Sequence, residues 1–238
     1  MNYEQLLDEI MVNTISANQL VGYPQKDFHY AVCPRTIEFH TSIFLSSALL
    51  CLNQKKPLII LVQVNNLEKD AMLYTWTIGP HFWRTRDLKK NAMTIEGTGK
   101  IPFTDKNYYP YLDKLFCYLS VINVNQNHLV LFIKKGEKKT ILANDLKKLL
   151  KNDYSLLVIS NCYENLPINT CKEESNTLIT HLKNKSMEST EKENFPAFSI
   201  LSEILPKQEN PNHIEQLINS WEIGFDDKKT TSLFFMLS

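Results

Sequence analysis

The segment from Tyr154 to Leu182 constrains the fold most, because a strand, a turn and a helix are predicted there in direct succession. The apolar run Ser155–Ile159 is typical of a parallel strand covered on both faces. It ends at Ser160-Asn161-Cys162, where a polar turn leads towards the helix. In open α/β sheets ligands bind at the loops that follow the carboxyl ends of strands. The segment therefore indicates both an architecture and a place to look for a site.

Apolar patterns along the rest of the chain predict further strands and helices. Thr170 and Glu173 have the spacing of a capping box, which predicts a helix start near Cys171. We also expect helices over 6–11, 41–52, 196–205 and 214–218 and one ending near 152, and extended segments over 28–32, 57–64, 129–133 and 231–237.

Two segments are predicted to be irregular, an aromatic-rich loop over 73–86 and a mobile polar loop over about 183–194. The remaining strands and helices alternate. This alternation predicts an α/β fold, a single domain over residues 1–238 with a mostly parallel central sheet flanked by helices.

The composition narrows the class of partner. The chain has 26 basic and 26 acidic residues among 238, so no overall charge attracts nucleic acid or an anionic membrane. Its apolar runs are too short to cross a bilayer. The acidic, amphipathic N-terminus does not resemble a signal peptide, and the five cysteines form no CxxC pair. We expect a soluble cytoplasmic protein with no nucleic-acid or membrane partner.

Two features have both a functional and a structural interpretation, whereas the histidines form no metal-binding motif. Cys162 is a nucleophile if a base stands beside it, but a lone cysteine is more often an inert small side chain. The aromatic residues around Trp76 and Trp83 suit either a protein partner or a lid over the domain's own core. No two of the six histidines have the close helical spacing of a metal-binding pair.

Several short blocks, taken in order, resemble the Memo-like family, also called protein B of the AmmeMemoRadiSam system. The blocks are Ala31-Val-Cys-Pro34, Leu61 to Asn66, Gly99-Lys-Ile-Pro102, Leu156 to Pro167, and Trp221 to Leu237. The family is related to the class III extradiol dioxygenases. The resemblance implies a Memo-like, extradiol-dioxygenase-like α/β domain with a metal pocket at one end of its sheet.

The departures from the family pattern fall on its metal ligands. Relatives bind iron, copper or zinc through two histidines and a cysteine, and the matching positions here carry Arg35, Asn66 and Phe195. A guanidinium repels a cation, an amide is a poor transition-metal ligand, and phenylalanine cannot ligate. From this comparison we expect no metal, no cofactor and no catalytic residues.

The resemblance and its departures together predict a non-catalytic binding or scaffolding protein with a degenerate active site. Its pocket is expected to be lined by Arg35, Glu38, His40, Asn66, Asn161 and Cys162, with Arg35 selecting a small anion or a carboxylate. The alternative is a metal-dependent oxidoreductase with a relocated site built from His40, His81 and Cys162 or Glu164. A third interpretation is a structural domain that docks a protein partner through the aromatic segment around Trp76 and Trp83.

Overall fold

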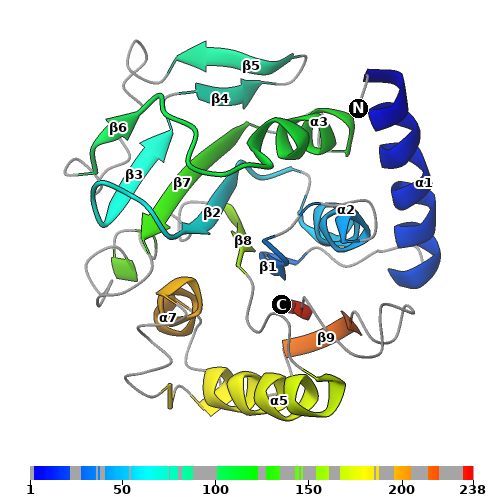
Figure 1. The fold of residues 1–238 in the computed structure, drawn as a ribbon, viewed down its shortest axis with the longest axis vertical. Coiled ribbons are helices and arrows are strands. Elements are labelled where there is room, and N and C mark those ends of the chain that lie inside the picture. Colours follow the sequence, from blue (N-terminus) through cyan, green and yellow to red (C-terminus); the bar gives the residue numbers. More distant parts are fainter. Residues whose placement is uncertain are drawn as a thin grey trace.

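The computed structural model describes residues 3–21, 28–35, 37, 41–53, 55–74, 76–79, 82–87, 101–122, 127–134, 143–144, 146, 154–160, 167–184, 186–187, 196–204, 214–219 and 233–237. All strands among these residues belong to one mixed sheet with helices on both faces (Figure 1). The predicted α/β architecture with a central parallel sheet is confirmed.

Four parallel strands form the centre of the sheet, in the spatial order β7-β2-β8-β1. They are β1 (Tyr30–Cys33), β2 (Leu58–Val64), β7 (His128–Lys134) and β8 (Ser155–Ile159). Every residue of β2 and β8 is buried. Strands covered on both faces need apolar side chains at successive positions, which explains the continuous apolar runs in the sequence.

Further strands extend the sheet on both sides of this centre, in pairs that are antiparallel except for the parallel pair of β3 and β6. At one edge β10 (Leu233–Leu237) pairs with β1, and β9 (Ile214–Asn219) pairs with β10. Near the other edge β3 (Ala71–Tyr74) and β4 (Trp76–Gly79) pair with β7, while β5 (Phe82–Asp87) pairs with β4 and the short β6 (Phe103–Thr104) with β3.

Three helices cover one face of the sheet: α1 (Tyr3–Val21), α2 (Ser42–Cys51) and α3 (Leu112–Ile122) (Figure 1). Alternate strand residues such as Val62 and Phe132 point into the core on this face. The helix α2 is buried on nearly every side because α1 and α3 pack against it as well as the sheet.

The opposite face is covered by α5 (Ile168–Asn184) and α7 (Pro196–Ile204) (Figure 1). The intervening strand residues, among them Leu61 and Val158, form a second core with Phe198 of α7. Ala143, Asn144 and Leu146 are helical, and the two apolar residues of these three belong to the same core. The sheet therefore separates two apolar layers.

Two predicted elements are wrong. The segment expected to be a loop over 73–86 contains the end of β3 together with β4 and most of β5. Its aromatic residues favour strands, which explains why the backbone there is extended. The helix expected over 214–218 is the strand β9, because pairing with β10 overrides a helical spacing that spans only one turn.

Three boundaries also differ from the prediction. The helix α5 begins at Ile168, where the amide of Cys171 donates to the carbonyl of Pro167, so Thr170 and Glu173 lie inside the helix and form no capping box at its start. The N-terminal helix is longer than 6–11. Residues 183–184 of the expected mobile loop belong to α5 and Met187 is buried, while residues 185 and 188–194 lie outside the described part.

Candidate functional site

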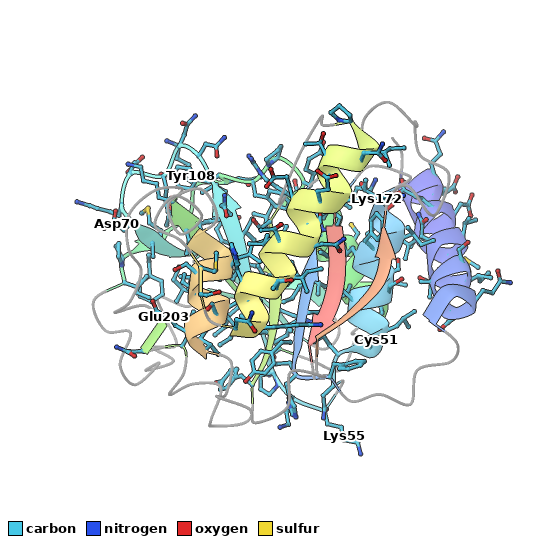
Figure 2. All side chains as sticks on the ribbon, turned by 90° about the horizontal axis from the view of Figure 1, so that it is seen from below. Cys51, Lys55, Asp70, Tyr108, Lys172 and Glu203 are labelled. Carbon is cyan, nitrogen blue, oxygen red and sulfur yellow. The ribbon has the colours of Figure 1, made fainter. Side chains whose placement is uncertain are left out.

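The carboxyl ends of β1, β2 and β8 define the candidate site. After β1 the chain crosses to α2 on one face, whereas after β8 it crosses to α5 on the other face. Such a reversal between neighbouring parallel strands is a topological switch point, where α/β proteins bind ligands. Figure 2 shows Lys172, near the start of α5, and Tyr108 at this end of the molecule and Lys55 at the opposite end.

Arg35 lies at this end, two residues after β1, and is partly buried. Its backbone is held on both sides. Cys33 and Ile37 are buried, and the Tyr109 hydroxyl donates a hydrogen bond to the backbone carbonyl of Arg35. The structure therefore places one cation of the predicted pocket at the switch point and fixes its main chain.

Cys33 is the thiol nearest to Arg35 along the chain, but its surroundings make it inert. The side chain is fully buried, and its sulfur lies 3.6 Å from the carbonyl oxygen of Pro34. Burial raises the pKa of the Cys33 thiol. Nucleophilic attack and metal ligation both require the thiolate, so Cys33 is suited to packing and not to chemistry.

Gln63 and Ser160 form a buried polar pair at the same end of the sheet. The Ser160 hydroxyl donates to Oε1 of Gln63 over 2.9 Å. This bond joins the carboxyl end of β2 to the residue that follows β8. Neither residue was predicted as part of the site. The signal was a single polar side chain inside the apolar run of β2.

The other predicted pocket residues are only partly located. Asn66 follows the carboxyl end of β2 and is exposed. Since β8 lies between β1 and β2, the strands that carry Arg35 and Asn66 are about 10 Å apart, twice the usual strand spacing. Glu38, His40, Asn161, Cys162 and Phe195 lie outside the described residues.

A second polar cluster joins the first three helices and was missed entirely. Glu9 and Asn13 of α1, Ser42 of α2, and Lys114 and Tyr118 of α3 meet there. The carboxylate oxygen Oε1 of Glu9 accepts from the hydroxyls of Ser42 and Tyr118 at 3.0 and 2.9 Å, and the Lys114 ammonium lies 2.6 Å away.

These polar groups satisfy one another in a nearly dry setting. Asn13 Nδ2 contacts both hydroxyls, at 3.1 Å from Ser42 Oγ and 3.2 Å from Tyr118 Oη. Ser42 and Tyr118 are inaccessible to solvent. A ligand has no route to the cluster through these side chains, so we interpret it as the structural connection that holds α1 on the domain.

The described histidines do not gather at the candidate site. His29 precedes β1 and His128 begins β7, at the amino ends of parallel strands, while His181 lies in the last turn of α5. His40 and His81 lie outside the described residues. Among the residues with described placement, no three or more histidine, cysteine, aspartate or glutamate side chains form a group suited to a metal ion.

We expect the protein to lose stability at alkaline pH, because a phenol and a thiol are buried near the site. Burial raises the pKa values of Tyr109 and Cys33 above their ordinary values of 10.0 and 9.0. The unfolded chain then loses these protons first, so stability is complete below those ordinary values and falls as the pH rises through the folded pKa values. Between its unfolded and its folded pKa, each group should lower the free energy of unfolding by up to about 1.4 kcal/mol per pH unit.

The measurement is urea unfolding in reducing buffer at pH 8, 10 and 11. Between pH 10 and 11 the free energy of unfolding of Tyr109→Phe should fall by about 1 kcal/mol less than that of the unmodified chain, because at pH 10 the unfolded tyrosine is already half ionised. An equal fall in both chains would show that Tyr109 titrates normally in the folded state.

Comparison with known proteins gives no functional assignment. No family model matches the chain, and no curated protein matches it. Among solved structures, the crystal structure of the uncharacterized protein JW3007 from Escherichia coli K12 aligns over 88% of this chain and 99% of its own. The TM-score is 0.48 and the sequence identity 11%, values that carry no argument about activity. No helix among the described residues combines the length and apolar character needed to span a membrane.

Proposed function

We propose that this chain is a divergent relative of the Memo-like family that has lost the family's metal ligands and acts as a binding protein. In this proposal the carboxyl end of the parallel sheet receives a ligand with an anionic group, a small anion or a carboxylate, and Arg35 contacts that group. The observation that carries the proposal is the position of Arg35 at the switch point, where the resemblance implies a metal ligand in relatives.

The local electrostatics support an anion at this place. The helix α5 is the next described element after β8, so its amino terminus lies at the carboxyl end of the sheet. Helix amino termini have unpaired amides and a partial positive charge, which favour anions. A guanidinium adds a full charge and a planar set of donors that matches a carboxylate or a phosphate.

The chemistry of the neighbouring side chains favours binding over catalysis. Cys33 is a buried thiol with a raised pKa. Gln63 and Ser160 bond to each other, and an amide and a hydroxyl of ordinary reactivity supply no general base. The described part of the site therefore contributes one cation beside a polar pair whose members bond to each other.

Two other functions remain predictions. A relocated metal site would use His40, His81 and Cys162 or Glu164, all outside the described residues. A protein partner docking at Trp76 and Trp83 would meet strands and not a loop, because Trp76 begins β4 and Trp83 lies in β5.

Arg35→Ala should abolish stabilisation by anions. We expect phosphate, sulfate or citrate to raise the thermal midpoint of the unmodified chain relative to chloride at equal ionic strength. A hydrogen bond to a charged group contributes about 1.5–3 kcal/mol, so Arg35→Ala should weaken binding at least about tenfold, and Arg35→Lys should weaken it less. Titration calorimetry with the same three anions measures the affinities.

Lys55→Ala is the matched control, because it also removes one positive charge but at the exposed opposite end of the molecule (Figure 2). Equal losses of affinity in Arg35→Ala and Lys55→Ala would mean that the anions act through overall charge alone.

A metal count on protein loaded in turn with iron, copper and zinc tests the alternative of a relocated metal site. About one metal per chain would overturn the proposal.

A further inference from the structure

Tyr109 combines complete burial with a polar contact across the fold. Its side chain has no exposed surface, and its hydroxyl donates to the backbone carbonyl of Arg35, a residue 74 positions earlier in the chain. The residue lies between β6 and α3, whereas Arg35 follows β1. This contact joins two loops that the sequence does not bring together.

The donor side of the contact is itself well held. The amide of Tyr109 donates to Oδ1 of Asn107 over 2.8 Å, and its carbonyl accepts from the amide of Leu112 over 3.0 Å. Its ring packs against Tyr111 with centroids 5.7 Å apart. The phenol is protonated at neutral pH because its ordinary pKa is 10.0, and burial raises that pKa further. The hydroxyl is thus a fixed and permanent donor.

The acceptor side is the residue whose side chain carries the proposed function. A partly buried arginine can sample many rotamers, and each one lost on binding weakens the affinity. Fixing its backbone does not restrict those rotamers, but it removes the separate cost of ordering the main chain on binding, so the guanidinium starts from one main-chain position. The flanking buried residues Cys33 and Ile37 limit the same segment from both sides.

We infer that Tyr109 is the positioning residue that sets Arg35 in place to bind an anion at the carboxyl end of the sheet. The inference rests on the proposed function, because it assigns to Tyr109 a role in the same site. Tyr109 does not touch the ligand in this arrangement. It acts through its hydrogen bond to the backbone of Arg35.

Tyr109→Phe should weaken anion binding without removing it. The variant keeps the ring and removes the single hydrogen bond, so the dissociation constant for phosphate, sulfate or citrate should rise about three- to tenfold. The loss in Arg35→Ala should be larger. The backbone carbonyl carbon of Arg35 should also change its NMR chemical shift in the ligand-free variant, a direct sign that its hydrogen bond has gone.

Tyr108→Phe is the control, since it removes a phenol hydroxyl from the same loop while its ring faces Lys106 and Phe132. It should change neither the affinity nor the Arg35 signal. Asn107→Ala is a second variant in case Tyr109→Phe does not fold. Asn107 is exposed, and losing its bond to the Tyr109 amide should weaken anion binding in the same direction.

The possible results distinguish the role of Tyr109 from anion binding by Arg35. Normal affinity in both Tyr109→Phe and Asn107→Ala, with binding lost in Arg35→Ala, would overturn the role of Tyr109 and leave the anion site standing. A threefold or greater loss together with the Arg35 shift would support it. An unmodified chain that binds none of the three anions would overturn both.

Discussion

Lys114→Met should destabilise the protein by about 3–5 kcal/mol, because it leaves the Glu9 carboxylate buried without its cation. Only 5% of the Glu9 side chain and 13% of the Lys114 side chain are exposed. Two hydroxyls would still donate to the carboxylate, but they do not neutralise its charge. Urea unfolding at pH 7 measures the change in the free energy of unfolding.

Lys106→Met is the matched control. Lys106 forms an ion pair with Glu68 at 3.2 Å, but the two side chains are 62% and 63% exposed, so losing the pair should alter stability by no more than about 1 kcal/mol. The two substitutions remove the same group from the same kind of pair. Their difference therefore measures what burial does to an ion pair in this protein.

The double variant Glu9→Gln with Lys114→Met tests the physical cause. Glutamine keeps an oxygen that accepts from Ser42 and Tyr118 but has no charge to leave unpaired. The double variant should therefore be more stable than Lys114→Met alone. A double variant no more stable than Lys114→Met alone would mean that the unpaired charge of Glu9 does not explain the loss.

The centre of the fold was predictable because its strands are covered on both faces. Burial on two sides requires apolar residues at successive positions, and this produces unbroken runs such as those of β2 and β8. Parallel pairing follows from the helices between the runs. The edge strands lack this pattern, so β9 was mistaken for a helix from one turn of apparent periodicity.

The candidate site was predictable only where it depends on strand ends. Arg35 and Asn66 follow apolar runs, so the sequence places each at the carboxyl end of a strand. The contact between Tyr109 and Arg35 and the cluster around Glu9 were not predictable, because their partners are separated by 74 and up to 109 residues. Such contacts depend on how helices and loops pack, which no local spacing encodes.

Phe132→Ala should be as destabilising as the loss of Lys114, by about 3–5 kcal/mol, through a different cause. Phe132 lies in β7, has no exposed surface, and is paired in register with Val62 of β2. Its ring meets those of Tyr74 and Tyr108 edge-on, with centroids 5.8 Å away in both cases. Truncation to alanine removes buried apolar surface and both ring contacts. One of these contacts, with Tyr74, joins the side chains of β3 and β7.

Phe103→Ala provides the control with the same chemical change, since that side chain in β6 is 41% exposed and should lose less than about 1 kcal/mol. Phe132→Leu should fall between the two, because leucine refills most of the space but restores no ring contact. If Phe132→Ala lost as little as Phe103→Ala, the apolar layer between the sheet and α3 could not be the core that holds the parallel strands together.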